Sequence, residues 1–403
     1  MGICMQKPKK ESSTKKEQSP MATYETKEKE PAQLQRPIRK QHVRLSVVPS
    51  KTPLANIDSD LLTSVKEAIT KSEKSHGVPE DGQNESKNSR ILVAGAPHEG
   101  RQNGFEDKRI RFEGENSNMS YVSSIGVGIA CKKGLKEDPH NQDDFTVLVD
   151  KAFQFFGVFD GHGAYGHEIS NFIHLLLPKL IIKHEQFEEN IHEAIIQSFL
   201  RANSSLVEHC DKPESTYDCM MSGTTATTVL IRNGHIFIGH VGDSRAVLCL
   251  KNGENIEAKR LTTDHKPTLA GELQRIQACN GEVKQLPDDV PHRIFMKGKD
   301  YPGLSTSRAL GDAIAQMVGV SPLPQYEDVP IQDNFEYIIM CSDGVWEFVK
   351  DQEAADTIAK SGKNVRQGAQ NLASLAWQRW ITNEEDVVDD ITVLAIHLPS
   401  LLK

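Results

Sequence analysis

Four aspartates stand where short apolar runs of the sequence are interrupted or end, and their positions suggest a metal site. They are Asp160, Asp243, Asp343 and Asp389. An unpaired carboxylate at the end of a buried strand is destabilising, so a cation beside these residues would stabilise them. Carboxylates without a Cys/His cluster favour a hard divalent cation, Mg²⁺ or Mn²⁺, that keeps several waters. Gly161 would let the backbone approach such a cation, although Asp160-Gly161 also fits an ordinary tight turn after a core strand.

Two such ions would direct the chemistry toward phosphate esters. Ions a few Å apart that share one carboxylate lower the pKa of a shared water and make it a nucleophile at neutral pH. They also neutralise the charge of a phosphate during in-line displacement. His162 lies next to this site in the sequence and can hold or release a proton near neutral pH. The chain contains neither a Ser/His/Asp elbow nor a Walker loop, so the sequence predicts phosphate-ester hydrolysis rather than acyl transfer or nucleotide-driven work.

Composition excludes several other classes of protein. The chain has 403 residues and a formal net charge of -9, whereas a nucleic-acid-binding domain is usually basic, so we expect no nucleic-acid partner. Its seven cysteines include no CxxC pair, which indicates reduced thiols in an intracellular protein of the cytoplasm or nucleus. The sequence has no apolar run near the roughly 18 residues of a membrane span.

Residues 1–115 differ from the rest and are predicted to form a largely disordered N-terminal extension. The polar segment 7–40 cannot bury enough surface to offset its ordering entropy. Two interpretations stay open for the extension, a solvated tail or a regulatory docking arm. Gly2 and Cys4 suggest acylation by myristate and palmitate, which would tether the protein to a membrane. Gln6, however, stands where the myristoylation pattern has Ser or Thr.

Folded sequence is expected from about Ser120, as short strands with brief connections and several amphipathic helices. Asn233-Gly234 between two apolar runs is a strong hairpin signal, and Asp243 is expected to interrupt a strand that continues to residue 250. The expected strands are 122–130, 145–149, 153–159, 222–230, 235–241, 246–250, 336–340 and 391–398. The expected helices are 168–183, 189–208, 268–278, 352–359 and 365–381.

Eight short motifs in this part of the chain occur in the order of a known family. They are Asn-Gln-Asp (141–143), Phe-Asp-Gly-His-Gly (159–163), Ser-Gly-Thr-Thr-Ala (222–226), His-Val-Gly-Asp-Ser-Arg-Ala (240–246), Leu-Thr-Thr-Asp-His (261–265), Ser-Arg-Ala-Leu-Gly-Asp (307–312), Ser-Asp-Gly (342–344) and Asp-Asp-Ile-Thr (389–392). Each is weak alone, but eight in order are very specific. From about Ser120 to its end, the chain resembles the metal-dependent serine/threonine protein phosphatases of type 2C, the PPM family.

The resemblance implies an α+β fold, a four-layer α/β/β/α sandwich of two antiparallel sheets flanked by helices. Residues 116–403 would form the catalytic domain, which would act as a monomer on phosphoserine and phosphothreonine in protein substrates. His162 would be the general acid that protonates the leaving Ser or Thr oxygen, and residues 287–301 would form a mobile flap that influences substrate choice. The implied metal ligands are Asp160 to both Mg²⁺ or Mn²⁺ ions, the carbonyl of Gly161, Asp343 and Asp389 to one ion, Asp143 through water and Asp243 to a third ion.

Three departures from the family pattern bear on activity. The family arginine that grips the substrate phosphate is absent, and the nearest candidates are Lys133 and Lys136, which offer point charges instead of a bidentate fork. Gln142 replaces a glutamate and Asp390 stands where asparagine is common, adding a negative charge near the metals. Two alternatives to an active phosphatase therefore stay open: an inactive phosphatase fold kept as a scaffold, and a membrane-tethered adaptor led by the N-terminal arm.

Overall fold

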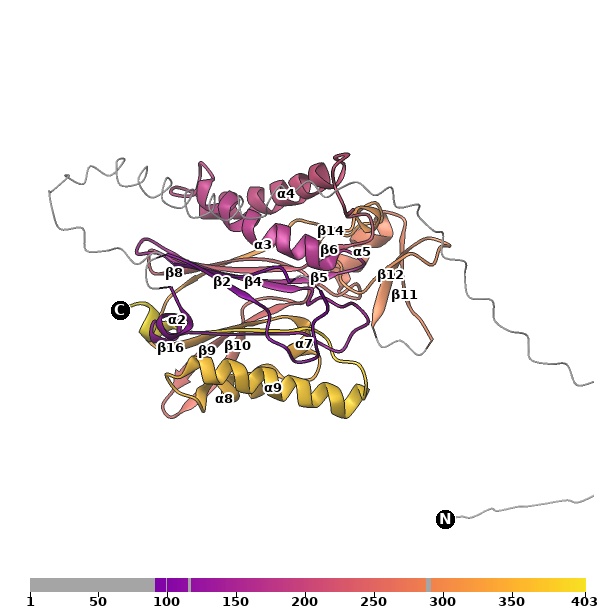
Figure 1. The fold of residues 1–403 in the computed structure, drawn as a ribbon. Coiled ribbons are helices and arrows are strands. Elements are labelled where there is room, and N and C mark those ends of the chain that lie inside the picture. Colours follow the sequence, from indigo (N-terminus) through magenta and orange to yellow (C-terminus); the bar gives the residue numbers. More distant parts are fainter. Residues whose placement is uncertain (1–90, 99, 115–116, 288–290) are drawn as a thin grey trace, which may run out of the picture. The chain divides into compact units, whose positions relative to one another are not determined.

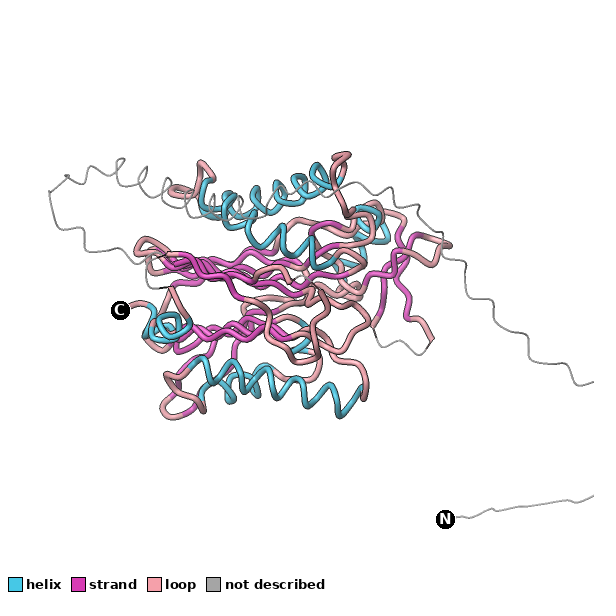
Figure 2. The backbone as a smooth tube through the Cα atoms, viewed as in Figure 1, coloured by secondary structure: helices cyan, strands magenta, loops and turns pink. Residues whose placement is uncertain are grey.

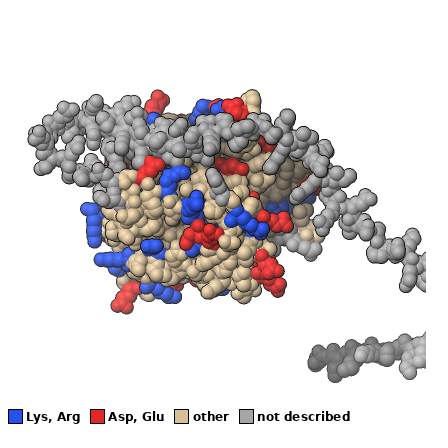
Figure 3. Space-filling model, in the orientation of Figure 1, with Lys and Arg blue, Asp and Glu red and all other residues tan. Residues whose placement is uncertain are grey.

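The computed structural model describes residues 91–98, 100–114, 117–287 and 291–403, all within one compact unit. Gly2, Cys4 and most of the predicted N-terminal extension lie outside the described residues. None of the helices in the described ranges combines the length and hydropathy that a membrane span requires. On the face seen in Figure 3, acidic and basic side chains of the described residues are interspersed.

Two antiparallel sheets form the centre of the fold (Figure 1). The first sheet has the order β15 (Gln325–Pro330), β8 (His235–Val241), β7 (Ala226–Arg232), β5 (Gln154–His162), β4 (Asp143–Val149), β1 (Ile91–Gly95) and β2 (Ile110–Glu113). The short β6 (Gly223–Thr224) pairs with the end of β5, and β14 (Leu310–Gly311) pairs with β6. The second sheet has the order β10 (Asn255–Arg260), β9 (Arg245–Asn252), β16 (Phe335–Cys341), β17 (Ile391–His397) and β3 (Val127–Lys132).

The apolar run of β5 shows why these strands are buried on both faces. Phe156 and Val158 point into the core between the two sheets, while Phe155 and Phe159 point into the core beneath the helices. This alternation follows from the two-residue period of a strand. A strand with apolar side chains on both faces needs a layer on each side, and the fold supplies a sheet on one and helices on the other.

Helices cover the outer face of each sheet, as Figure 2 shows. The first sheet is covered by α3 (Gly166–Lys183) and α4 (Ile191–Cys210), whose buried apolar side chains share one core with the outward residues of β5. The second sheet is covered by α8 (Asp351–Ala359) and α9 (Val365–Glu384). The four-layer α/β/β/α arrangement predicted from the sequence is therefore confirmed.

A smaller unit lies beside the sandwich. It contains the three-stranded sheet β11 (Gly281–Gln285), β12 (His292–Met296) and β13 (Pro302–Leu304), with α5 (Ala270–Ala278) and α6 (Ala313–Gln316) packed on a separate small core. In the segment expected as a flap, 287–301, residues 288–290 lie outside the described residues, and the described remainder comprises β12 and its flanking turns. The remaining short helices are α2 (Met119–Ser124), α7 (Asp343–Trp346) and α10 (Leu398–Leu401).

The expected start of the fold, near Ser120 with residues 1–115 outside it, is wrong for residues 91–113. Strand β1 pairs with β4 in the middle of the first sheet, and β2 extends that sheet by one strand. Ile91, Leu92 and Val93 are fully buried. The apolar run of β1 is only five residues long and is flanked by polar sequence, so it lacks the long periodic pattern that predicts a folded segment.

Two further expectations about strands are wrong. Residues 122–130 do not form one strand, because α2 occupies 119–124 and β3 begins only at Val127. The strand expected to continue through Asp243 instead ends, and the chain crosses from β8 in the first sheet to β9 in the second. Gly242 makes this crossing with a φ of 107°, a backbone conformation that strongly favours glycine.

Candidate active site

The predicted site residues meet where strands of both sheets end on the same side. Asp143 and Asp160 lie directly opposite each other on the paired strands β4 and β5. Asp343 follows β16 and Asp389 precedes β17, at neighbouring ends of paired strands. Strands β16 and β17 contact β4 and β5 across the sandwich. Residues spread over about 250 positions of sequence are thus brought to one edge.

A cavity of about 270 Å³ opens at this edge. Its walls come from both sheets and from the smaller unit. Among its lining residues are Lys136, Asp160, Gly161, His162, Asp243, Arg293, Asp312, Asp343 and Asp389. All but two of the residues predicted as catalytic, metal-binding or phosphate-binding therefore line one cavity. The exceptions are Asp143, which lies buried behind Asp160, and Lys133.

The carboxylates around the cavity are crowded and poorly satisfied. Oxygen Oδ1 of Asp143 and Oδ1 of Asp343 are buried and make no hydrogen bond among the described residues. Burial and then the Asp389 carboxylate raise the pKa of Asp343 to about 8. Burial and then Asp390 raise the pKa of Asp143 to about 7. Burial and then Asp343 raise the pKa of Asp160 well above its usual range. Such a donor set fits a hard divalent cation, which would satisfy these oxygens and lower the pKa values again.

Lys136 is the cation that the chain itself places among these acids. Its ammonium forms an ion pair with Asp389. Burial alone would lower the pKa of Lys136, but Asp389 and then Asp390 outweigh burial and raise the pKa well above its usual value. The side chain is therefore charged, and it lines the cavity.

Lys133 has a different partner from the one expected. Its ammonium lies 3.1 Å from Oδ1 of Asp390, and the two side chains are only 2% and 1% exposed. Asp390 also accepts hydrogen bonds from the backbone N–H groups of Gly134 and Gln142, at 2.7 and 2.9 Å. The extra negative charge of Asp390 is thus balanced inside the protein, and Lys133 is not placed to contact a phosphate.

The side chain of Gln142 forms hydrogen bonds with other residues of the chain and does not line the cavity. Its amide nitrogen donates to the carbonyl oxygen of Gly163 at 2.8 Å and to Oδ2 of Asp138 at 3.2 Å. Its backbone carbonyl accepts from the N–H of Gly161. A Cβ at Gly161 would lie 2.1 Å from the carbonyl oxygen of Gly166, so close packing of β5 on the start of α3 requires glycine there.

His162 is held by Asp312, a contact that no pattern in the sequence predicts. Nitrogen Nε2 of His162 lies 2.6 Å from Oδ2 of Asp312. Burial alone would lower the pKa of His162, but the Asp312 carboxylate outweighs it and raises the pKa. The carboxylate fits because Gly223 has no side chain, since a Cβ there would lie 2.1 Å from Oδ2 of Asp312. The motif at 307–312 contains Asp312, but no spacing in the sequence connects it to His162.

Asp243 lines the cavity but already has a partner. Its Oδ2 lies 2.6 Å from the ammonium of Lys266. Burial opposes ionisation, yet Lys266 outweighs it and lowers the pKa of Asp243. Lys266 directly follows the motif at 261–265 and was not predicted. A third ion at Asp243 would therefore have to displace this ammonium.

Backbone anchors hold Asp160 in place. Its N–H donates to Oγ1 of Thr225 at 3.0 Å, and its carbonyl accepts from the Thr225 N–H at 2.9 Å. Oγ1 of Thr225 lies 2.7 Å from Oγ of Ser244, next to Asp243. The Thr-rich motif at 222–226 thus ties the end of β5 to the crossing between the sheets.

Comparisons with known proteins agree with this geometry. A family model described as "Protein phosphatase 2C" matches residues 130–383. "Probable protein phosphatase 2C 61" of Arabidopsis thaliana is 34% identical over 293 residues, covering 70% of this chain and 85% of that protein. "Probable protein phosphatase 2C 35" of the same plant is 31% identical over 288 residues, covering 66% and 80%. The crystal structure of serine-threonine phosphatase 2C from Toxoplasma gondii has a TM-score of 0.60 and 23% identity, covers 67% of this chain and 94% of that one, and supports the fold.

Proposed function

Because the chain belongs to the protein phosphatase 2C family and is a protein serine/threonine phosphatase, we propose that its activity requires Mg²⁺ or Mn²⁺ held in the carboxylate cavity. The observation that carries this proposal is the crowding of the buried carboxylates of Asp143, Asp160 and Asp343, together with the oxygens of Asp143 and Asp343 that make no hydrogen bond among the described residues. Lys136 and Lys266 offset part of the charge of these buried acids, and divalent cations would neutralise the excess that remains.

The residues that would hold the ions are those that the family resemblance implies, and all of them except Asp143 line the cavity. Asp160 and the carbonyl of Gly161, both at the end of β5, would be ligands of the ions. Asp343 and Asp389 would hold one ion, Asp143 would support the site through water, and Asp243 would take a third ion. When bound, such cations supply a nucleophile from water at neutral pH and neutralise the phosphate charge.

His162 is proposed to be the general acid for the leaving Ser or Thr oxygen. Asp312 keeps the imidazole protonated to higher pH and holds Nε2, so the transferred proton would come from Nδ1. The same contact fixes the orientation of the ring over the cavity. Asp312 would thus act as a positioning residue and not as a proton donor.

Two cationic side chains on the cavity wall are candidates for contact with the substrate. Lys136 would offer its ammonium to the phosphate from the side of Asp389. Arg293, on β12 of the smaller unit, also lines the cavity and donates to the carbonyl oxygen of Gly303 at 3.0 Å. Because β12 belongs to the segment expected to influence substrate choice, Arg293 would contact the phosphoprotein near its phosphate.

Phosphate release from a phosphothreonine peptide tests the metal requirement. We expect turnover with Mg²⁺ or Mn²⁺, loss of turnover with excess chelator, and no metal-dependent turnover in Asp160→Asn. Asp328→Asn, an exposed aspartate on edge strand β15, is the matched control and should retain full activity. Turnover that survives both the chelator and Asp160→Asn would overturn the proposal.

Acylation of Gly2 and Cys4 stays a prediction, as does membrane association through them. Intact mass of the chain purified from eukaryotic cells tests it, with Gly2→Ala as control. We expect added mass corresponding to myristate and palmitate in the wild-type chain alone. The proposed monomeric state can be measured in the same preparation by light scattering.

A further inference from the structure

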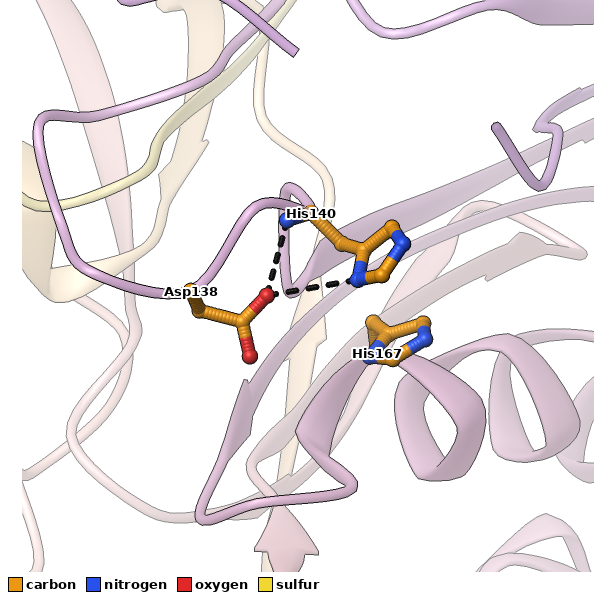
Figure 4. Close-up of side chains that lie close together, drawn as sticks. All are labelled: Asp138, His140 and His167. Carbon is orange, nitrogen blue, oxygen red and sulfur yellow. Dashed lines mark hydrogen bonds and ion pairs between the residues drawn. The ribbon is translucent and has the colours of Figure 1, made fainter. Parts of the chain in front are cut away.

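A group of two histidines and an aspartate lies outside the carboxylate cavity. Asp138 and His140 belong to the loop that leads into β4, and His167 stands in the first turn of α3. One potential ligand atom from each residue lies within 4.8 Å of the other two. Figure 4 shows the two imidazole rings stacked, with the Asp138 carboxylate beside the His140 ring. We call these three residues the His–His–Asp cluster.

The distances within the cluster are short. Nitrogen Nδ1 of His140 lies 3.4 Å from Oδ1 of Asp138. The imidazole rings of His140 and His167 have centroids 4.1 Å apart and planes inclined by 23°. The loop and the helix that carry them are packed closely, since a Cβ at Gly166 would lie 2.9 Å from the amide nitrogen of Gln142. The start of α3 and the loop that carries Asp138 and His140 therefore lie close together beside the cluster.

Two polar atoms at the cluster lack a hydrogen bond. Nδ1 of His167 and Oε2 of Glu168 are both buried and lie 3.0 Å apart, at the distance of an ion pair, but neither makes a hydrogen bond with the other or with another described group. Buried polar atoms are normally satisfied, so this pair indicates a missing partner. A cation is the partner that an imidazole nitrogen and a carboxylate oxygen can share.

We propose that Asp138, His140 and His167 bind a borderline divalent cation such as Zn²⁺, at a site separate from the carboxylate cavity. Two imidazoles and a carboxylate are a donor set that suits Zn²⁺, whereas Mg²⁺ prefers oxygen ligands. Zinc bonds to nitrogen or oxygen are about 2.0–2.2 Å long, so ligand atoms must approach to roughly 3.3 Å of one another. The side chains of Asp138, His140 and His167 are 23%, 28% and 27% exposed, which leaves them free to make this adjustment and gives the ion a path from solvent.

The site has room for a fourth ligand and a structural link to the active site. Glu168 stands next to His167 and could complete the shell, or a water could. The second oxygen of Asp138 accepts from the Gln142 amide, which also donates to the carbonyl of Gly163, the residue after His162. The proposed ion would thus share its carboxylate ligand with a side chain that supports the turn beside His162.

Direct zinc binding tests the proposal without using phosphatase activity. Zn²⁺ is titrated against the full chain in competition with a chromophoric chelator, with Mg²⁺ saturating so that hard-ion sites are occupied. The test variant is His140→Ala/His167→Ala. The matched control is His235→Ala, which breaks a surface His–Asp pair whose atoms lie 2.6 Å apart but which belongs to no three-residue cluster in the described ranges.

We expect one Zn²⁺ per chain in the wild type and in His235→Ala. In the double variant we expect the affinity to fall by at least the roughly tenfold that loss of even an outer-shell partner costs. Should the double variant fail to fold, judged by its thermal unfolding, His140→Ala alone serves, because His140 lies in a loop. Zinc binding of equal stoichiometry and affinity in the folded variant, or no zinc binding by the wild type, would overturn the proposal.

Discussion

His162 and Asp312 are separated by 150 positions in the sequence and by 2.6 Å in the structure. The Asp312 carboxylate raises the pKa of His162, so the protonated imidazole persists to higher pH than it otherwise would. Asp312→Asn keeps the size of the side chain and suits the left-handed backbone at this position, where φ is 52°. Removing the charge lowers the pKa of His162, so the basic limb of the pH–rate profile should move to lower pH.

The measurement is kcat against pH in the presence of saturating metal. His162→Ala is the reference, since loss of a general acid typically lowers the rate by roughly 10²- to 10⁴-fold and removes its limb from the profile. In the His162→Ala background, Asp312→Asn should have no further effect on the shape of the profile. A basic limb that stays in place in Asp312→Asn alone would show that Asp312 does not set the protonation of His162.

Lys133 and Asp390 are both buried and charged, so each should depend on the other for the stability of the fold. Removing one partner of a buried ion pair typically costs about 3–5 kcal/mol of the free energy of unfolding, since the other charge is left uncompensated. We therefore expect Lys133→Met and Asp390→Asn each to be strongly destabilising. The double variant should be less destabilised than the sum of the two, because it leaves no unpaired charge. Urea unfolding of the four proteins closes this double-mutant cycle, and additive effects would contradict the pairing.

At the scale of single elements, the crossing between β8 and β9 should make the stability of the fold depend on pH. Nδ1 of His265 accepts the N–H of Gly242 at 3.1 Å, and its ring stacks on buried His240. An imidazolium at this position could not accept that hydrogen bond. Burial and then His240 lower the pKa of His265 to about 2, and burial lowers the pKa of His240 to about 4. Both rings are therefore neutral in the folded protein near neutral pH.

The sign of the pH effect follows from these lowered pKa values. Between about pH 6.5 and pH 4 the unfolded chain binds protons at His240 and His265 and the folded chain does not, so acidification destabilises the fold. Each histidine contributes about 1.4 kcal/mol of lost unfolding free energy per pH unit in this window. Urea unfolding at pH 7 and pH 5 measures the change, and His265→Gln should reduce it. Carboxylates that titrate in the same range contribute equally to both proteins, so their effect on the unfolding free energy drops out of the comparison. The control is His192→Ala, at an exposed position of α4. An equal pH dependence in His265→Gln would contradict the assignment.

Whether a strand could be predicted from the sequence depended on how many of its faces are buried. Strands β5 and β16 are apolar on both faces and were predicted, as was the hairpin at Asn233-Gly234, where φ is 51° and 76°. The edge strands β10 and β15 were not predicted, because each has one partner strand and largely polar sequence. No local pattern states that β8 and β9 belong to different sheets, since that depends on contacts far away in the chain.

The candidate site divides in the same way. Aspartates at strand ends were identifiable one by one, because each breaks an apolar run. The partners of site residues were not identifiable, because pairing depends on the fold: Lys133 with Asp390, Lys266 with Asp243 and Asp312 with His162. Two apparent departures from the family pattern, Lys133 and Asp390, turn out to be one compensated pair.

At the scale of the whole molecule, the two sheets are joined through the site. Oγ of Ser342, at the end of β16, donates to Oδ2 of Asp143 on β4 at 2.6 Å, and Asp390 accepts from the Gln142 N–H. The first sheet depends in turn on β1 and on the segment that follows it. The ammonium of Lys108 lies 3.0 Å from Oδ2 of Asp144, where both side chains are buried, and it also donates to the carbonyls of Asn141 and Asp143.

A deletion series tests how far toward the N-terminus the catalytic domain extends. Removing residues 1–115 takes away β1, where Ile91, Leu92 and Val93 would each contribute about 1.5–3 kcal/mol by burial. It also leaves Asp144 as a buried charge without Lys108. The combined loss is comparable to the roughly 5–15 kcal/mol that stabilises a typical domain, so this protein should be insoluble or unfolded and inactive.

Removing only residues 1–88 retains every described contact and should leave both the thermal unfolding transition and the phosphatase activity in place. Circular dichroism melts and phosphopeptide turnover compare the two truncated proteins side by side, and a folded, active chain that begins at residue 116 would show that β1, β2 and Lys108 are dispensable.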